Sequence, residues 1–438
     1  MKKGILYFFI IYFLSNCTAT KISLKEANKA LMIDSAIATA HIGISVYEPF
    51  TNKYWFNYNA DKYFVPASNT KLFTLYTALK YLGDSIEGLK YYETADSLFV
   101  QPTGDPTFLH VDFLHHPVDD FLSKNTKPIV FYTPTNLAEK YGHGWSWDDF
   151  DDYYMAQRNT FPMFGNLLHI EASREENDSY TTAELSPLLK DFNITYSYDG
   201  KKEDASIKRF PSCNLFNVIF SKKDSGINTN IPFETNGISS TISFLENRYH
   251  IATTIKEENS KINWLNIYSQ PVDTVLKKML FNSDNFYAEQ LLLMASNNKL
   301  GFFSDKEMIE YVLKTDLKEM PQRPKWVDGS GLSRYNLFSP QNFIFILNKI
   351  SKEYGFSRLC SILPTGGEGT LKNYFISDSA FVFAKTGTLS SVVALSGIII
   401  TKKNKELLFS VLVNNSISSS MSVRKAVERF VKSIRENY

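Results

Sequence analysis

A serine and a lysine lie three positions apart, at Ser68 and Lys71, in the stretch VPASNTKLFTLYTAL of residues 65–79. On a helix these two positions lie one turn apart, so the Ser68 hydroxyl and the Lys71 amine can come within hydrogen-bonding reach. A lysine that is removed from water has a lowered pKa and can accept the serine proton, which makes the serine a nucleophile. Ser68 and Lys71 are therefore a candidate nucleophile and general base.

Ser68 also has a simpler interpretation, as the N-cap of a buried apolar helix predicted over residues 72–81. Taken alone, an S-x-x-K tetrapeptide favours this interpretation, because such tetrapeptides are common. A capping box, however, requires Glu or Gln where this chain has Lys71. A lysine in the first turn is also opposed by the helix dipole, and the chemical interpretation explains why it is there.

Two further short motifs follow along the chain. The segment FNSDN places Ser283 and Asn285 in a polar interruption of an apolar helical region, where a turn between helices is the alternative explanation. The segment AKTGTLSSV places Lys-Thr-Gly-Thr at 385–388, where a lysine and a glycine bulge on an edge strand are the alternative. Each motif alone is weak. In this order, however, Ser-x-x-Lys, Ser-x-Asn and Lys-Thr-Gly are the parts of penicillin-recognising serine acyl-enzymes.

Longer stretches resemble one family of these enzymes, the class C low-molecular-mass penicillin-binding proteins, which are D-alanyl-D-alanine carboxypeptidases and endopeptidases. An early S-x-x-K, a large insertion before S-x-N and the sequence DGSGLSR are specific to that family in combination. The similar stretches are VPASNTKLFT (65–74), PTGDPTF (102–108), GWSWDDFDDYY (144–154), NSDNFYAEQLL (282–292), DGSGLSRYNLFSP (328–340), LPTGGEGTLKN (363–373) and AKTGTLSSVVALSG (384–397). The resemblance implies a serine peptidase that acts on peptidoglycan stem peptides and is acylated by β-lactams.

The resemblance also implies a role for each residue of the first two motifs. Ser68 attacks the carbonyl carbon of the penultimate D-Ala, expels the terminal D-Ala and forms an acyl-enzyme, with Lys71 as its general base. Ser283 lies beside Lys71 and relays a proton to the leaving amine. Asn285 binds a backbone carbonyl of the substrate or steadies Lys71.

The residues of the third motif are implied to bind the substrate. Lys385 supplies positive charge near its C-terminal carboxylate and holds Ser283 in place, and Thr386 donates a hydrogen bond to that carboxylate. Gly387 leaves room for the substrate to lie along the strand. The backbone N–H groups of Ser68 and Thr388 form the oxyanion hole.

An acidic group and a second serine need separate interpretation. Most aspartates of GWSWDDFDDYY are expected to form a solvated face. The family uses an acidic residue of its insertion to hold the free amine of a diaminopimelate-containing stem peptide, and we assign this role to Asp148. Ser330 of DGSGLSR is expected to belong to a tight turn that supports the cleft and not to be a second nucleophile.

These motifs must be positioned by one fold. The resemblance implies an α/β (α+β) peptidase domain, an antiparallel sheet with helices on both faces, built from residues 18–90 and 271–438. A mostly-β domain is expected to be inserted at 91–270. The pattern of the sequence agrees, since residues 41–58 predict a β-hairpin and residues 420–435 a final helix.

The N-terminal stretch MKKGILYFFIIYFLSNCTATK has the features of a secretory signal peptide. Two lysines precede an apolar run over residues 5–14 that is too short to span a bilayer as a retained helix. The sequence Leu-Ser-Asn-Cys at 14–17 resembles the box at which bacterial lipoproteins are cut and diacylated, although Asn16 replaces the usual small residue. We therefore predict a signal peptide at 1–17, a lipid on Cys17 and a membrane-anchored protein of the periplasm or cell envelope.

Composition argues against several other functions. The chain has 47 Lys and Arg residues against 46 Asp and Glu residues. It therefore lacks the excess of positive charge that is typical of a nucleic-acid-binding protein. Its 7 histidines show no HExxH or HxxxH spacing, so we expect no metal and no cofactor. Cys213 and Cys360 are interpreted as buried thiols.

Two other functions remain open at this point. A β-lactamase shares the fold and the acylating residues, but it must also hydrolyse the acyl-enzyme quickly. For this it uses a glutamate between the second and third motifs, or Tyr-x-Asn at the second, where this chain has Ser-Asp-Asn. A catalytically inactive cell-wall-binding lipoprotein would keep the cleft and lose the chemistry, and the intact motifs argue against it.

Overall fold

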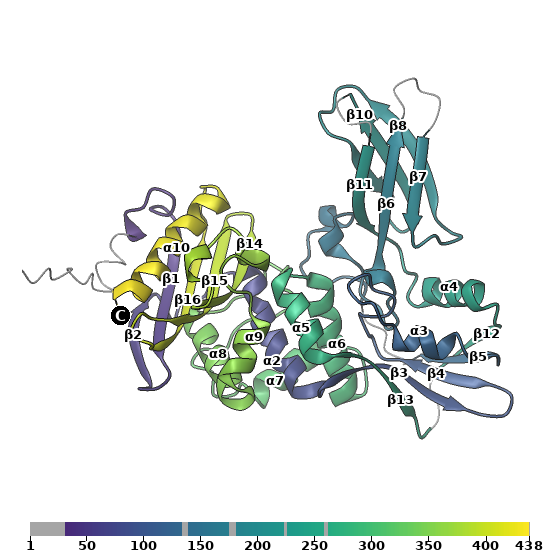
Figure 1. The fold of residues 1–438 in the computed structure, drawn as a ribbon, viewed down its shortest axis with the longest axis horizontal. Coiled ribbons are helices and arrows are strands. Elements are labelled where there is room, and N and C mark those ends of the chain that lie inside the picture. The colour runs from purple at the N-terminus through teal and green to yellow at the C-terminus, as the bar shows by residue number, and fades with distance from the viewer. Residues whose placement is uncertain (1–30, 134–138, 175–180, 223–225, 258–261, 438) are drawn as a thin grey trace, which may run out of the picture.

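The computed structural model describes residues 31–133, 139–174, 181–222, 226–257 and 262–437 (Figure 1). The predicted signal peptide at 1–17 and the predicted lipid on Cys17 lie outside the described residues. No helix in the described part of the chain is long and apolar enough to cross a membrane.

A five-stranded antiparallel sheet in the order β14-β15-β16-β1-β2 forms the centre of one part of the molecule. Its strands are β1 (His41–Glu48), β2 (Lys53–Tyr58), β14 (Val382–Leu389), β15 (Val392–Ile400) and β16 (Glu406–Asn414). The pairing of β1 with β2 confirms the hairpin predicted over residues 41–58. β1 also pairs with β16, with Ile44 opposite Val411, so the two ends of the chain share one sheet.

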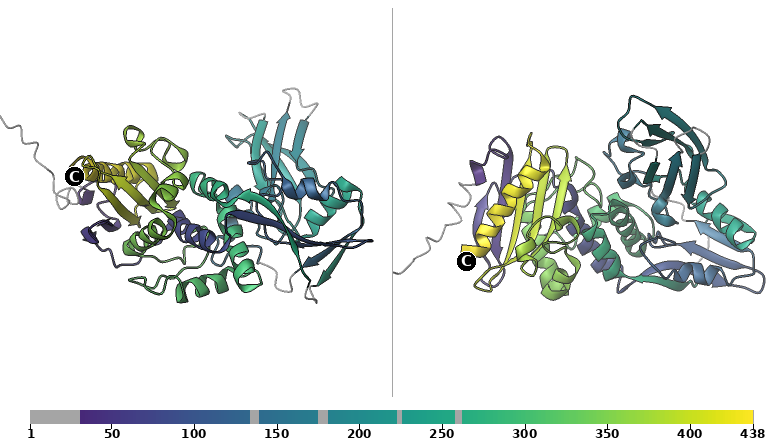
Figure 2. Two further views of the ribbon diagram at one scale, coloured as in Figure 1. Left: turned by 60° about the horizontal axis from the view of Figure 1, so that its bottom comes forward. Right: turned by 45° about the horizontal axis from the view of Figure 1, so that its top comes forward.

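Helices cover both faces of this sheet, as the sequence predicted. The helix α10 (Ser420–Asn437) lies across one face (Figure 2), where Val427 and Val431 pack with Ile44 and Val411 of the strands. On the other face Leu72 of α2 and Ile346 of α8 pack against Ile398. The helices on this side are α2 (Lys71–Tyr81), α5 (Val272–Phe281), α6 (Asn285–Leu300), α7 (Asp305–Lys314), α8 (Pro340–Tyr354) and α9 (Phe356–Ile362). We call this sheet with its helices the body.

The apolar helical region that the FNSDN segment interrupts is divided into α5 and α6. The polar residues 282–284 end the first helix and begin the second. Asp284 is the N-cap of α6 and accepts a hydrogen bond from the backbone N–H of Tyr287 at 2.9 Å. The polar interruption is thus a boundary between two helices, and the cap at Asp284 stabilises the second of them.

The described residues between β3 and β13 are mainly strands and form an insertion beside the body (Figure 1). A five-stranded sheet in the order β12-β5-β4-β3-β13 adjoins two three-stranded sheets, β11-β6-β7 and β8-β10-β9. The elements are β3 (Ser85–Glu93), β4 (Leu98–Pro102), α3 (Pro117–Leu122), β5 (Ile129–Thr133), β6 (Leu167–Arg174), β7 (Thr181–Ser186), β8 (Asn193–Asp199), β9 (Ser206–Arg209), β10 (Leu215–Ser221), β11 (Gly226–Pro232), α4 (Ser239–Tyr249), β12 (Thr253–Glu257) and β13 (Leu265–Pro271).

The insertion has its own hydrophobic core, which includes Leu89, Phe131 and Phe216. The mostly-β character predicted for this region is confirmed. The boundaries at residues 90 and 270 stay a prediction, and the first of them falls inside β3, which pairs with β13.

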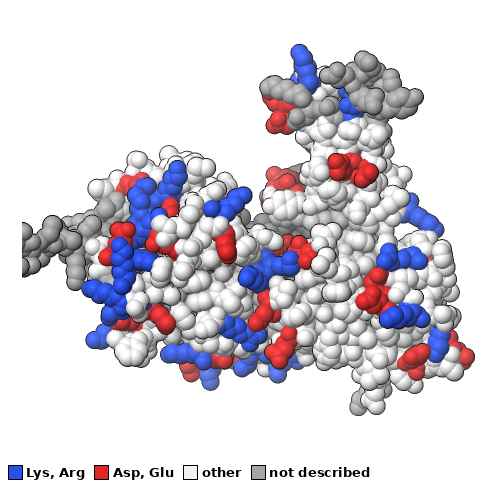
Figure 3. Space-filling model, in the orientation of Figure 1, with Lys and Arg blue, Asp and Glu red and all other residues white. Residues whose placement is uncertain are grey.

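Short 3-10 turns connect many of these elements. They are η1 (Ala67–Thr70), η2 (Trp147–Asp149), η3 (Tyr153–Met155), η4 (Phe164–Asn166), η5 (Gly369–Leu371) and η6 (Ile376–Asp378). On the face shown in Figure 3, Lys and Arg lie among Asp and Glu, in keeping with a net charge of +1. Because the two signs of charge are mixed on this face, the electrostatics of the site depend on the charged groups that lie close to it.

Candidate active site

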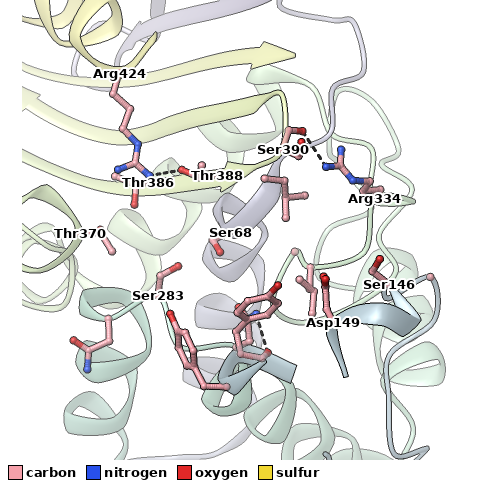
Figure 4. Close-up of a pocket in the computed structure, with 18 residues that line it drawn as sticks. Ser68, Ser146, Asp149, Ser283, Arg334, Thr370, Thr386, Thr388, Ser390 and Arg424 are labelled. Atoms are coloured by element: carbon pink, nitrogen blue, oxygen red, sulfur yellow. Dashed lines mark hydrogen bonds between the residues drawn. The ribbon is translucent and has the colours of Figure 1, made fainter. Parts of the chain in front are cut away.

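Ser68 lies in the short turn η1 that leads directly into α2. Neither η1 nor α2 has a side-chain hydrogen bond at its N-cap, so the interpretation of Ser68 as a helix cap is wrong. Ala67, just before it, has φ 48°, a left-handed conformation that a residue other than glycine adopts only under constraint. This turn leaves Ser68 in the lining of a cleft (Figure 4).

Lys71 is fully buried beneath Ser68. Its amine donates hydrogen bonds to Ser68 Oγ at 3.1 Å, to Asn285 Oδ1 at 2.7 Å and to the carbonyl oxygen of Ser330 at 2.8 Å. Three acceptors match the three N–H bonds of a charged lysine. The amine is therefore fixed in place, with one of its bonds directed at the candidate nucleophile.

Burial lowers the pKa of Lys71 from its ordinary value to about 8, because a charged amine is disfavoured away from water. The negative charges of Asp284, Asp328 and Glu289 act in the opposite direction and keep the pKa from falling further. Near neutral pH a minor but substantial fraction of Lys71 is consequently neutral, and a neutral amine can accept the proton of a hydroxyl group at hydrogen-bonding distance.

The second motif forms the joint between α5 and α6. Ser283 has φ 58° in this joint, and Asn285 is the first residue of α6. The Asn285 amide accepts from Lys71 through Oδ1 and donates through Nδ2 to the carbonyl oxygen of Tyr154 in the insertion, at 3.2 Å. Ser283 and Asn285 both line the cleft with Ser68. The Ser-x-Asn motif therefore does form a turn between two helices, and this turn places Ser283 and Asn285 in the site.

Lys385 is also fully buried, and its amine is directed at the second motif. It donates to Ser283 Oγ at 2.9 Å and to the carbonyl oxygen of Thr386 at 2.7 Å. Burial lowers the pKa of Lys385 well below its ordinary value, and the positive charges of Lys71 and Arg424 lower this pKa further. The structure thus brings Lys385 to Ser283, as the sequence predicted, but does not place it in the lining of the cleft.

Gly387 lies where β14 passes close to the turn that carries Ser68. A Cβ atom at this position would lie 2.7 Å from the carbonyl oxygen of Pro66 and 3.1 Å from the backbone nitrogen of Ser68. The glycine therefore makes room for the turn that carries Ser68, and it is not among the residues that line the cleft. The expectation that it also makes room for the substrate stays a prediction. Its neighbours Thr386 and Thr388 do line the cleft.

The cleft has a volume of about 740 Å³ and lies between the body and the insertion (Figure 4). The body contributes residues of all three motifs, and the insertion contributes a wall from the GWSWDDFDDYY segment. The lining residues are Ser68, Gly144, Ser146, Asp149, Tyr153, Tyr154, Asn282, Ser283, Asn285, Gly331, Leu332, Arg334, Thr370, Thr386, Thr388, Leu389, Ser390 and Arg424. The volume is in the range typical of sites that hold a small ligand.

Asp148, predicted to hold an amine of the substrate, does not line the cleft. It is exposed and its carboxylate accepts a hydrogen bond from Ser146 Oγ at 2.7 Å, which lowers its pKa. Asp149 lines the cleft instead, and partial burial raises its pKa. The two residues are adjacent in η2, where successive side chains point about 120° apart, so the sequence could not distinguish them.

The DGSGLSR segment supports the turn of Ser68 from below. A Cβ atom on Gly331, which has φ +81°, would lie 1.9 Å from the carbonyl oxygen of Ala67. Asp328 closes the loop by accepting from the backbone N–H groups of Gly331 at 2.9 Å and Ser333 at 2.6 Å. Ser330 is buried and offers Lys71 its carbonyl oxygen. These contacts agree with the structural interpretation of Ser330.

Sequence analysis missed a buried charge network beneath Lys71. Arg158 of the insertion, 2% exposed, donates to Glu289 Oε2 at 3.0 Å and to Asp305 Oδ2 at 2.6 Å. Glu289 Oε1 in turn accepts from the backbone N–H of Ser330 at 2.7 Å. Burial raises the pKa of Glu289 to about 7. The position of Glu289 one helical turn after Asn285 was the available signal.

The described residues contain no group of three or more His, Cys, Asp or Glu side chains that could hold a metal ion. Cys360 is half-buried and Cys213 is exposed, so the interpretation of Cys213 as a buried thiol is wrong. The side chains that line the cleft offer hydroxyl groups, the Asn285 amide, the Asp149 carboxylate and the guanidinium groups of Arg334 and Arg424.

A serine hydroxyl hydrogen-bonded to a buried lysine, beside a Ser-x-Asn turn and a Lys-Thr-Gly edge strand, defines a penicillin-recognising serine acyl-enzyme. The sequence profile of the D-Ala-D-Ala carboxypeptidase 3 (S13) family matches residues 24–262 and 256–434. The chain therefore belongs to this family.

Two characterised relatives support this membership over most of the chain. Penicillin-sensitive carboxypeptidase A of Dictyostelium discoideum is 23% identical over 458 residues, which cover 87% of this chain and 83% of that protein. D-alanyl-D-alanine carboxypeptidase DacB of Haemophilus influenzae is 22% identical over 400 residues, 82% of each chain.

Solved structures show the same fold. Penicillin binding protein 4 (dacB) from Haemophilus influenzae has a TM-score of 0.75 at 19% identity, over 94% of this chain and 98% of that one. The same protein complexed with a β-lactam has a TM-score of 0.70 at 18% identity, with the same coverage. The resemblance to class C low-molecular-mass penicillin-binding proteins, and the serine D-Ala-D-Ala carboxypeptidase activity that it implied, are confirmed.

Proposed function

We propose that Ser68 is the nucleophile of this carboxypeptidase and Lys71 its general base. The observation that carries the proposal is the hydrogen bond of 3.1 Å between Lys71 Nζ and Ser68 Oγ, made by an amine with no exposed surface. Neutral Lys71 takes the hydroxyl proton while Ser68 Oγ attacks the carbonyl carbon of the penultimate D-Ala. The backbone N–H groups of Ser68 and Thr388 would stabilise the negative oxygen of the tetrahedral intermediate.

Breakdown of that intermediate needs a proton on the leaving amine. Ser283 is the residue we assign to this transfer, because it lines the cleft and accepts a hydrogen bond from Lys385. Asn285 is assigned to holding Lys71, since its two amide atoms already contact Lys71 and Tyr154. Terminal D-Ala leaves as a free amine, and water then hydrolyses the ester on Ser68 to regenerate the hydroxyl.

The substrate class is the peptidoglycan stem peptide, and β-lactams acylate the same serine. For a free amine on the peptide side chain we now propose Asp149 in place of Asp148. Asp149 lines the cleft on the wall that the insertion supplies, whereas Asp148 faces away and is satisfied by Ser146. A carboxylate at this wall offers an ion pair to an amine such as that of diaminopimelate.

A fluorescent penicillin tests the assignment and separates the three candidate activities. We expect one stable label per chain, absent in Ser68→Ala and strongly slowed in Lys71→Met. Rapid turnover of the label would favour the β-lactamase alternative. No labelling of the wild type would favour the inactive cell-wall-binding protein and contradict the proposal. Release of D-Ala from a pentapeptide, compared with cleavage of a cross-linked dimer, measures the balance between carboxypeptidase and endopeptidase activity.

We also propose that the protein is exported through a signal peptide at residues 1–17 and anchored to a membrane by a lipid on Cys17. Both features rest on the N-terminal sequence, and export agrees with a substrate outside the cytoplasm. Labelled palmitate should be incorporated into the wild-type protein in bacterial cells and not into Cys17→Ser. Equal labelling of the two proteins, or none of the wild type, would contradict lipidation.

A further inference from the structure

A segment of the insertion, residues 154–159, is docked on the helix α6 of the body (Figure 1). The Tyr154 carbonyl oxygen accepts from Asn285 at the start of the helix, and one turn further on Arg158 donates to Glu289. The second contact is an ion pair with almost no exposed surface, 2% for the Arg158 side chain and 0% for Glu289. A charge of the insertion is thus buried inside the body, where it needs partners for all its polar atoms.

The Glu289 carboxylate joins Arg158 to the loop of residues 328–331, which carries an acceptor of Lys71. Its Oε2 accepts from Arg158 Nη1 at 3.0 Å, and its Oε1 accepts from the backbone N–H of Ser330 at 2.7 Å. The carbonyl oxygen of Ser330 in turn accepts from the Lys71 amine at 2.8 Å. The position of that carbonyl oxygen therefore depends on Glu289.

The insertion also holds the second carboxylate of this loop. Asp328 Oδ1 accepts from the backbone N–H of Gly331, which is the other end of the peptide bond that Ser330 begins, at 2.9 Å. Asp328 Oδ2 accepts from Trp145 Nε1 of the insertion at 2.9 Å. The Arg158 guanidinium lies over the Trp145 ring, 5.6 Å from its centroid. Trp145 and Arg158 thus form one unit that contacts both carboxylates beneath Lys71.

Glu289 acts on Lys71 through its charge as well as through the loop. Burial lowers the pKa of Lys71 to about 8, and the negative charge of Glu289 offsets part of this change. Burial raises the pKa of Glu289 to about 7, so Glu289 is mostly ionised where Lys71 loses its proton. The other charged groups that act on this pair are Arg158 of the insertion, Asp305 of α7, Asp328 of the loop, Asp284 before α6 and Lys385 of β14.

We infer that Glu289, held by Arg158 of the insertion, is a positioning residue for the base Lys71. It fixes the loop whose Ser330 carbonyl oxygen binds the Lys71 amine, and its charge favours the protonated form of that amine. The inference rests on the proposed function, because it takes Lys71 as the base. The insertion thereby takes part in acylation itself, in addition to supplying a wall of the cleft.

Labelling of the full chain by a fluorescent penicillin, followed over the pH range in which Lys71 titrates, tests the two effects separately. Glu289→Gln keeps an oxygen for the Ser330 N–H but loses the charge, so the midpoint of the rate against pH should fall by roughly 1 unit. Glu289→Asp keeps the charge on a shorter side chain, so the midpoint should stay and the rate at the high-pH plateau should fall about 10- to 100-fold. A wild-type midpoint in Glu289→Gln, or a wild-type plateau in Glu289→Asp, would overturn the inference.

The part played by the insertion is tested at Arg158. Arg158→Gln should slow labelling at the plateau roughly 10-fold, because Glu289 loses the partner that holds it. Arg158→Lys should recover part of the rate, since its amine can still pair with Glu289. A wild-type rate in Arg158→Gln would remove the insertion from the acylation step.

Gln290→Met is the matched control for Glu289. Gln290 is the next residue of α6 and is also fully buried, and its Nε2 donates to the carbonyl oxygens of Gly104 and Asn159 in the insertion at 2.8 Å each. This variant should lower the temperature of unfolding and leave the midpoint and the plateau at their wild-type values. If it moved the midpoint as far as Glu289→Gln does, weaker docking alone would explain the shift and the inference would be overturned.

The proposed function fails in a different way. If Lys71→Met is labelled at the wild-type rate, or the wild type takes no label, the assignment of the base is wrong whatever the variants of Glu289 do. If Lys71→Met is slow while the variants of Glu289 and Arg158 behave as the wild type does, only the positioning role is wrong.

Discussion

Two sets of charged residues in the site, which we call the floor and the rim of the cleft, differ in their exposure to solvent. We define the floor as Lys71 and Lys385, which have no exposed surface and whose amines each hold a serine hydroxyl. The rim consists of Asp149, Arg334 and Arg424, which are at least partly open to solvent. Burial lowers the pKa of both floor lysines, and we propose the neutral form of Lys71 as the base. The rim charges line the cleft, where a bound substrate would meet them.

The largest effect should come from removing the base in the floor. Lys71→Met should lower the rate of acylation by a β-lactam about 10²- to 10⁴-fold, the usual contribution of a general base. Stopped-flow labelling with a fluorescent penicillin measures this rate. Lys80→Met, an exposed lysine on the same helix, is the control and should acylate normally. A Lys71→Met protein that acylates at the wild-type rate would remove Lys71 from the mechanism.

The floor should also give the reaction a pH dependence. Burial lowers the pKa of Lys71 to about 8, so its neutral and basic form increases as the pH rises through that value. Acylation should therefore accelerate roughly 10-fold per pH unit well below about 8 and level off above it. The measurement is the second-order rate constant of labelling from pH 6 to 9.5. A rate that is constant or falls over this range would contradict a neutral lysine as the base.

Beneath the floor, the ion pairs of Arg158 should contribute more to stability than those at the surface. Arg158→Met leaves Glu289 buried without its partner, which typically destabilises a protein by about 3–5 kcal/mol. Arg323→Met breaks an exposed pair with Glu310 and should cost less than about 1 kcal/mol. Thermal unfolding of the two variants side by side measures the difference. Equal midpoints would mean that the buried network does not hold the insertion to the body.

The smallest effect should distinguish two adjacent aspartates at the rim. Asp149→Asn should raise KM for a stem peptide with a free side-chain amine roughly 2- to 5-fold, because a partly exposed ion pair contributes about 0.5–1 kcal/mol. Asp148→Asn should leave KM unchanged. Acetylating the amine of the peptide should remove the difference between wild type and Asp149→Asn. The reverse pattern, with Asp148 sensitive, would restore the prediction made from the sequence.

The floor was largely predictable from the sequence and the rim was not. Ser68, Lys71, Ser283 and Lys385 belong to short motifs whose local spacing is the signal, and the structure brings all four together. At the rim, by contrast, Arg424 becomes part of the site only because α10 packs beside β14. Its neighbours in the sequence carry no sign of this contact.

The fold shows the same division. Local patterns predicted the hairpin of β1 and β2 and the helices α2 and α10. The order of the strands could not be predicted in this way, because β1 pairs with β16 from the far end of the chain. Gly387 was recognised as a motif residue, but the reason for it, the approach of Pro66, exists only after folding.

The pairing of β1 with β16 also has a consequence for the order of folding. Ser68 and β1 are made early in synthesis, yet one edge of β1 has no partner until β16 has been made. The central sheet therefore closes through contacts of very large sequence separation, which form late in folding because a long loop must first be closed. Lys385, which donates a hydrogen bond to Ser283, lies on β14 of the same sheet, so we expect the complete site to form only with this late closure.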